Sequence, residues 1–343
     1  MRSGLRIRFA LMAIVLAPVD TAHTQPARLR VGTIAPAGSP WIQSLELMKK
    51  NVEARGSGIQ FQIFPGGQLG DEVQLAEGTQ FGTLECSGIS AGALATLVPS
   101  FDVFELPYVW NSPEEAYYVI DNHFRGFFAQ ELQRHGLVLL GWSENGWRNF
   151  HTRNRAIRRP EDLRGLRMRS QESPIHLAFW RALGANAQPM AVTDVYQAFE
   201  RGVIDGGENT IVLTIATGWA EVLKHVTISR HIYQPAVLVC NKKAWDRLTP
   251  AQHGRIAEAM TITEKDMRQR LAESEVETLA LFRNDMKIQV VELTAGQMDA
   301  FRQRTQGVMN QPDIRRHLGA EVLQVLERGK QEYAKKPIPV KKF

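Results

Sequence analysis

Cysteine is scarce in this chain, whose 343 residues include only Cys86 and Cys240. Small exported domains that depend on disulfides carry many more cysteines, and no Cys-x-x-Cys pair is present to hold a metal or a redox centre. Both cysteines fall within strand-like runs and lie 154 positions apart. An exported chain could oxidise them, but we expect two buried, reduced thiols and a fold that its own core stabilises.

The body of the chain also has little net charge. The whole sequence carries +5, but residues 1–24 hold +2 and the last fourteen residues hold +4, which leaves −1 for residues 25–329. A phosphate-binding surface needs basic residues spread over the folded body. We therefore expect no nucleic-acid partner. Arginine is the commoner basic residue, with 29 arginines against 12 lysines in the whole chain.

Motifs of metal and cofactor chemistry are absent. The nine histidines are scattered without His-Glu-x-x-His spacing, and neither a phosphate-binding loop nor a dinucleotide fingerprint occurs. We expect no metal site and no cofactor. One enzyme pattern does match, because residues 88–92 read Gly-x-Ser-x-Gly after a predicted strand, which could make Ser90 a nucleophile. Three fixed positions of common residue types form a weak signal, and we favour a strand end of small residues that lines a cleft.

No apolar run reaches the roughly 18 residues of a membrane-spanning helix. The longest candidate, residues 9–17, has nine apolar residues after three arginines, and Pro18 then breaks it. Ala22-His23-Thr24 offers small residues where a signal peptidase would cut. We predict that residues 1–24 form a cleaved signal peptide and that the mature protein is periplasmic. An uncleaved anchor or a disordered leader is the alternative.

From residue 28 onward, strand-like and helix-like segments alternate. Alternating or continuous apolar runs predict strands at residues 29–34, 59–64, 84–89, 137–142, 148–152, 166–169 and 236–240. Helices are expected between them, near residues 40–54, 174–183 and 193–201. Such alternation is typical of an α/β fold with crossover connections. Two α/β units in one exported chain indicate two lobes with a ligand cleft between them.

A long helix is predicted after residue 249. Thr249-Pro250-Ala251-Gln252 combines an N-cap, proline at the first helical position and glutamine at the third, a capping box. After Gly254 neither glycine nor proline interrupts the segment before Gly296, so a helix of about 50 Å could run to Asp285 and brace both lobes. Two shorter helices with a bend are an equal alternative.

Arginines cluster in the middle of the chain. Between residues 148 and 169 there are eight, namely Arg148, Arg153, Arg155, Arg158, Arg159, Arg164, Arg167 and Arg169. A guanidinium is permanently charged and pairs with a carboxylate through two parallel hydrogen bonds. Most of the cluster should be solvated surface. Arg167 and Arg169 occupy the same face of a predicted strand, so periodicity cannot choose between them.

This region carries a family resemblance. Residues 157–169 (IRRPEDLRGLRMR), 189–199 (PMAVTDVYQAF) and 203–209 (VIDGGEN) resemble segments of the solute-binding subunits of tripartite ATP-independent periplasmic (TRAP) transporters. Residues 67–71 (GQLGD) and 106–109 (LPYV) match as well. The segments occur in family order along nearly all of the mature chain. The chain is thus similar to a TRAP solute-binding protein of the C4-dicarboxylate-binding type.

The resemblance implies roles for three residues. Arg169 would bind a ligand carboxylate bidentately, Arg148 would add a second positive contact, and Asn209 would donate a hydrogen bond to the carboxylate. Glu208 would be structural. The implied fold is a two-lobe periplasmic binding protein of type II-like architecture. We place the first lobe at residues 25–146 plus 235–275 and the second at residues 147–234 plus 276–343.

Four further positions limit the ligand's chemistry. Sialic-acid binders of the family use polar first-lobe groups for hydroxyls, where this chain has Ile34 and Ser90. Val192 stands where an aromatic often packs on the ligand, and Glu172 could pair with an arginine or select a ligand with an amine or hydroxyl. This lining suits a small or partly apolar carboxylate better than a sugar acid.

The expected function is therefore capture of a small organic anion and its delivery to TRAP permease subunits, by a monomeric protein that is not an enzyme. A secreted enzyme on the same frame is the rival hypothesis. A lyase would use His151 or Glu172 as the acid or base, and a hydrolase would use Ser90. A binding protein that serves a sensor system is a third possibility.

Overall fold

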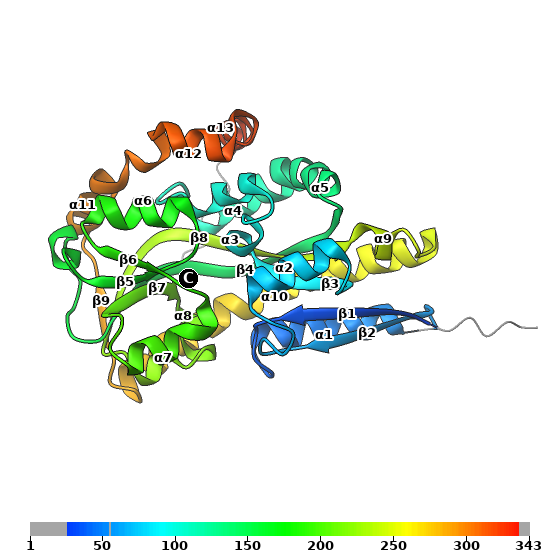
Figure 1. Ribbon diagram of the computed structural model, residues 1–343, viewed down its shortest axis with the longest axis horizontal. Coiled ribbons are helices and arrows are strands. Elements are labelled where there is room, and N and C mark those ends of the chain that lie inside the picture. The colour runs from blue at the N-terminus through cyan, green and yellow to red at the C-terminus, as the bar shows by residue number, and fades with distance from the viewer. Residues whose placement is uncertain (1–25, 55, 336–343) are drawn as a thin grey trace, which may run out of the picture.

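A computed structural model describes residues 26–54 and 56–335 (Figure 1). The predicted signal peptide and residues 336–343 lie outside these residues. A single mixed sheet has the strand order β2-β1-β3-β8-β4-β7-β5-β6, and β9 pairs with β8. The strands are β1 (Ala27–Thr33), β2 (Ile59–Phe64), β3 (Cys86–Ser90), β4 (Leu137–Thr152), β5 (Arg167–Ser170), β6 (Asn186–Pro189), β7 (Gly206–Thr210), β8 (His225–Asn241) and β9 (Gln289–Glu292).

Helices cover this sheet on both sides. The main ones are α1 (Pro40–Glu53), α2 (Glu72–Phe81), α3 (Ala91–Leu94), α4 (Pro113–Val119), α5 (Arg125–Arg134), α6 (Pro174–Leu183), α7 (Val195–Glu200), α8 (Ile211–Ala216), α9 (Lys242–Trp245), α10 (Pro250–Asn284), α11 (Ala295–Thr305), α12 (Pro312–Leu318) and α13 (Ala320–Lys335). Short 3₁₀ turns that matter below are η1 (Pro99–Glu105) and η4 (Val192–Asp194). None of the helices in the described part of the chain is long and apolar enough to span a membrane. The predicted α/β class is confirmed.

Two long antiparallel strands, β4 and β8, join the halves of the molecule. In Figure 1 the strands β1 to β3 lie at one end and β5 to β7 at the other, while β4 and β8 extend between them. We predicted two strands at residues 137–142 and 148–152, but β4 is continuous. Gly146 has φ +92°, a conformation open to glycine, and the ladder with β8 shifts register there instead of ending.

The helix α10 is one continuous helix of 35 residues. Its capping box forms as predicted, because Thr249 Oγ1 accepts from the Gln252 amide at 3.3 Å and the Gln252 side chain accepts from the Thr249 amide at 2.9 Å. The helix packs on α1 and β4, and farther along on α8 and β9 (Figure 1). It therefore contacts both halves of the sheet, as the bracing hypothesis requires.

The lobe boundaries of the sequence analysis fall within β4, β8 and α10 and remain a proposal. The last two helices differ from that division. Both α12 and α13 pack on η1 or α4, which belong to the first-lobe range, although residues 276–343 were placed in the second lobe. Apolar residues of α12 and α13 join the same core cluster as Phe104 and Phe128. The two helices pack where their apolar side chains are buried, although the neighbouring residues in the sequence were placed in the second lobe.

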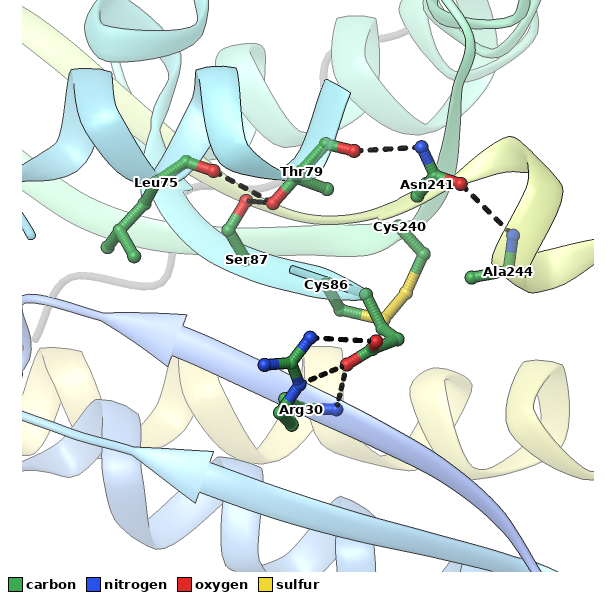
Figure 2. The surroundings of a disulfide bond; sticks show 9 residues. Arg30, Leu75, Thr79, Cys86, Ser87, Cys240, Asn241 and Ala244 are labelled. Carbon is green, nitrogen blue, oxygen red and sulfur yellow. Dashed lines mark hydrogen bonds and ion pairs between the residues drawn. A yellow bond between two sulfur atoms is a disulfide. The ribbon is translucent and has the colours of Figure 1, made fainter. Parts of the chain in front are cut away.

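The expectation of two reduced thiols is wrong. Cys86 of β3 and Cys240 of β8 form a disulfide, and both residues are buried (Figure 2). They face each other directly in the antiparallel β3–β8 pair, with Cα atoms 4.0 Å apart. Beside them Arg30 pairs with Glu85, with Nε and Oε2 2.7 Å apart. The low cysteine count could not reveal this bond, because it depends on the pairing of two strands distant in sequence.

Candidate functional site

Arg169 lies near the end of strand β5 and is only 3% exposed. Its Nε and Nη2 both donate to the Met190 carbonyl oxygen, at 3.1 and 2.9 Å, and Nη1 has no hydrogen-bond partner among the described residues. Burial and the nearby charge of Arg148 lower the pKa of Arg169 to about 10. No described carboxylate forms an ion pair with it. A buried cation without a protein counter-ion favours the arrival of an anion.

Arg167, two residues earlier on the same strand, has a different environment. Its Nη2 lies 2.6 Å from Oδ1 of Asp205, and its side chain is 46% exposed. The structure therefore decides which of the two arginines is available to a ligand, a choice that strand periodicity left open. Arg167 forms a surface ion pair, whereas Arg169 faces the interior.

A cavity lies against Arg169. Its lining comes from both halves of the chain: Asp71, Glu72, Gly92 and Ala93 on one side, and Arg169, Gln171, Glu172, Ala191 and Val192 on the other. Two predicted site residues, Glu172 and Val192, are thus brought to Arg169. A Cβ at Gly92 would lie 2.7 Å from Oε1 of the buried Glu105, so a larger residue there would force that carboxylate to shift.

Glu72 was missed by the sequence analysis. It stands at the start of α2, beside the capping residue Asp71, and its carboxylate accepts from the Ser90 amide at 2.7 Å and from Ser90 Oγ at 2.9 Å. Burial raises the pKa of Glu72, although the Ser90 hydrogen bonds and the charges of Arg169 and Arg148 act in the opposite direction. The GQLGD segment marked this turn, but only the fold places the next residue facing Arg169.

A second cavity shares the lining residue Glu72 with the first. The predicted residues Ile34 and Ser90 both line it. Its remaining wall is mainly apolar and includes Trp41, Trp142, Leu213, Met260 and Met267. Together the two cavities form a charged compartment at Arg169 and an apolar compartment beyond Glu72.

Arg148 and Asn209 line neither cavity. Arg148 is 2% exposed and donates from Nη2 to Oε1 of Glu208 at 2.7 Å, and from Nη1 to Oε1 of Gln234 at 2.7 Å. Asn209 Oδ1 accepts from the Thr210 amide at 2.9 Å, while its buried Nδ2 has no partner among the described residues. Asn209 lies on β7, which pairs with the strand of Arg169, and Arg148 lies on β4, the next strand beyond β7. Direct contact of either residue with a ligand remains a prediction.

Glu208 organises a buried network around Arg148. His176 Nδ1 lies 3.3 Å and His231 Nε2 3.6 Å from its carboxylate oxygens, and His176 Nε2 lies 2.7 Å from Oε2 of Glu105. Burial alone would raise the pKa of Glu208, but the charges of Arg148 and His176 hold it well below its usual range. Burial would likewise lower the pKa of His176, yet the two carboxylates raise it to about 9. This agrees with the structural role expected for Glu208.

The enzyme hypotheses find little geometry to support them. Ser90 Oγ donates to Glu72 and accepts from the Ala93 amide, and no described histidine is bonded to it. His151 is buried beside Thr214, with Nδ1 3.2 Å from Oγ1, and burial lowers its pKa to about 3. Within the described residues no cluster of three or more His, Cys, Asp or Glu side chains could hold a metal ion.

The sequence matches the family described as bacterial extracellular solute-binding protein, family 7, over residues 31–313. A solute-binding protein of Verminephrobacter eiseniae is 31% identical over 69% of this chain and 71% of its own length. The C4-dicarboxylate-binding periplasmic protein of Rhodobacter capsulatus is 27% identical over 91% of this chain and 93% of its own.

Solved structures agree with this match. A sugar-acid-binding protein of Advenella mimigardefordensis, in complex with galactonate, is 25% identical, covers 90% of this chain and 99% of its own, and superposes with a TM-score of 0.85. A TRAP periplasmic solute-binding protein of a Polaromonas species, bound to D-erythronate, is 27% identical over 88% of this chain and 98% of its own, with a TM-score of 0.82. The chain therefore belongs to family 7 of the bacterial extracellular solute-binding proteins, the family of the TRAP solute-binding subunits.

Proposed function

We propose that this protein binds a small organic carboxylate between its two lobes and presents it to TRAP permease subunits in the membrane. The observation that carries the proposal is the buried Arg169 guanidinium, which forms no ion pair with any carboxylate in the described part of the chain and borders a cavity lined from both halves of the chain. A ligand carboxylate there would accept a hydrogen bond from Arg169 Nη1. It would take the place that water has beside an exposed guanidinium. Charge-assisted hydrogen bonds of this kind are about twice as strong as neutral ones.

The other site residues would act around this contact. Glu172 and Val192 would touch the ligand from the second lobe, and Ser90 would hold Glu72 on the first. Arg148 and Asn209 would add positive potential and a hydrogen-bond donor behind Arg169. Because the cavity takes its wall from both lobes, a bound anion would stabilise the closed arrangement.

Membership of this family supports a periplasmic location, and we propose that residues 1–24 direct export and are then removed. We further propose that the mature protein works as a monomer and binds its ligand without turning it over. The organic acids named for its relatives, such as galactonate and D-erythronate, support a carboxylate ligand for this chain as well.

Isothermal titration calorimetry of Arg169→Ala tests the proposal. The ligand is first identified by mass spectrometry of the small molecules that co-purify with the protein. Loss of the guanidinium should weaken binding by about 100-fold or more. A charged hydrogen bond contributes roughly 1.5–3 kcal/mol, and a bidentate contact with a carboxylate consists of two such hydrogen bonds.

Arg167→Ala is the matched control on the same strand. It removes an exposed guanidinium already paired with Asp205, so affinity should stay within about twofold. Equal affinities for wild type and Arg169→Ala would refute carboxylate capture by Arg169.

A further inference from the structure

The apolar compartment beyond Glu72 has few groups to offer a hydroxylated ligand. Most of its wall is hydrocarbon or aromatic, from Ile34, Trp41, Trp142, Leu213, Met260 and Met267. Ile34 directly follows β1, and the others come from α1, β4, α8 and α10, so separate parts of the fold converge on one apolar space. None of the described residues lining it is a lysine, an arginine or a histidine.

Three of the hydroxyl side chains in that wall, Ser44, Ser90 and Thr263, already donate hydrogen bonds to the protein. Ser44 Oγ donates to Oδ2 of Asp266 at 2.6 Å, and Thr263 Oγ1 donates to the Ala259 carbonyl oxygen at 2.9 Å. The hydroxyl of Ser90 is bonded to Glu72. A ligand hydroxyl next to these three would have to break one of the bonds or stay unpaired, and either outcome is unfavourable. The other uncharged polar side chains of the wall are Thr33, Ser143 and Asn145, and Asn145 Nδ2 donates to Oε1 of Gln234 at 3.2 Å.

Glu72 stands where the two compartments meet. Its acidic side chain faces Arg169 on one side and the apolar wall on the other. A second carboxylate on the ligand that extended past Glu72 would move away from Arg169 and close to the acidic side chain of Glu72. It would then enter a space that offers no positive charge. This arrangement disfavours dicarboxylates.

We propose that the ligand is an amphipathic monocarboxylate, whose carboxylate binds Arg169 and whose alkyl or aromatic tail occupies the apolar compartment. The proposal rests on the carboxylate-binding function above and adds its substrate class. Affinity then grows with tail length, because each buried methylene strengthens binding by about fourfold. An amphipathic monocarboxylate differs from the galactonate, glucuronate or succinate bound by relatives of this chain.

Three six-carbon acids make a matched test by calorimetry on the full mature protein, stripped of co-purified ligand by unfolding and refolding. Hexanoate has an apolar tail, gluconate has a hydroxylated one and adipate ends in a second carboxylate. We expect hexanoate to bind at least 30-fold more tightly than the other two. It should bind about 16-fold more tightly than butanoate, because its tail is two methylenes longer.

Two variants locate the tail. Ile34→Asn puts an amide into the apolar wall and should weaken hexanoate binding by about tenfold. Val276→Asn changes a residue of α10 that is 70% exposed and should leave the affinity unchanged. Circular dichroism melts of both variants identify any loss of folding.

The outcomes separate the two proposals. Tighter binding of gluconate or adipate that still disappears in Arg169→Ala overturns the apolar-tail assignment and keeps carboxylate capture. If none of the acids tested binds in an Arg169-dependent way, carboxylate capture fails and the apolar-tail assignment fails with it. Hexanoate preference that Ile34→Asn leaves intact also contradicts the assignment of the tail to this compartment.

Discussion

Strand β4 begins among hydrocarbon side chains and ends among charges. Leu137, Leu140 and Trp142 pack in the apolar core, whereas Arg148 and His151, at the other end, lie next to buried titratable groups. At the apolar end stability comes from area removed from water and from the Cys86–Cys240 bond. At the charged end every group depends on a named partner, so loss of one leaves another buried without compensation. The same strand therefore has a tolerant end and a vulnerable end.

The largest effect should come from Glu208→Ala, which breaks the charged end. It leaves Arg148 buried without its carboxylate, a change that typically costs about 3–5 kcal/mol of unfolding free energy. Chemical denaturation monitored by circular dichroism measures it. Asp246→Ala, which removes one partner of the exposed Lys242–Asp246 pair, should cost less than about 1 kcal/mol. Equal losses in the two variants would mean that the buried network is not the vulnerable part.

Removal of the disulfide should come next. The double variant Cys86→Ser, Cys240→Ser should lose about 2–4 kcal/mol of stability, because a bond that closes a loop of this length restricts the unfolded chain. Denaturation with and without dithiothreitol measures the same effect in the wild type. Affinity for the ligand should change far less, since neither cysteine lines a cavity. An unchanged denaturation midpoint would show that the apolar end does not depend on the bond.

The smallest effect concerns pH. The pKa of His176 is raised to about 9 in the folded protein, and Glu105, Glu208, Arg148 and His231 surround it. A group whose pKa is raised on folding stabilises the protein fully below its unfolded pKa, near 6.5, and less as pH rises toward 9. Wild type should therefore lose about 2–3 kcal/mol between pH 6.5 and 9. In His176→Asn most of this slope should disappear, leaving the part due to His317, whose pKa its hydrogen bond to Asp102 raises. An undiminished slope would assign the effect to groups other than His176.

Local signals in the sequence account for the elements that local chemistry controls. The capping box at Thr249 predicted where α10 begins, and alternating residues predicted β2. The buried network could not be predicted in this way. Glu105, His176, Glu208 and Gln234 come from four separate elements, and only the sheet order brings them together.

The site divides along the same line. Motif resemblance singled out Arg169, Ile34, Ser90, Glu172 and Val192, and the structure places all five on two adjoining cavities. Glu72 was missed because nothing in its neighbourhood marks an acid that will face a distant arginine. Arg148 shows the reverse problem, since its residue type fits anion binding but its partner Glu208 is revealed only by the β4–β7 pairing.

The position of β8 between β3 and β4 also sets an order of events for the growing chain. The first 136 residues can form β1, β2 and β3, but the neighbour of β3 in the sheet is not made until residues 225–241 emerge. Pairings of such high contact order form slowly and leave strand edges open meanwhile. The disulfide between Cys86 and Cys240 cannot form until the same strand has been made. A chain of this topology is suited to folding after its complete release, in a compartment where the bond can form last and secure the finished sheet.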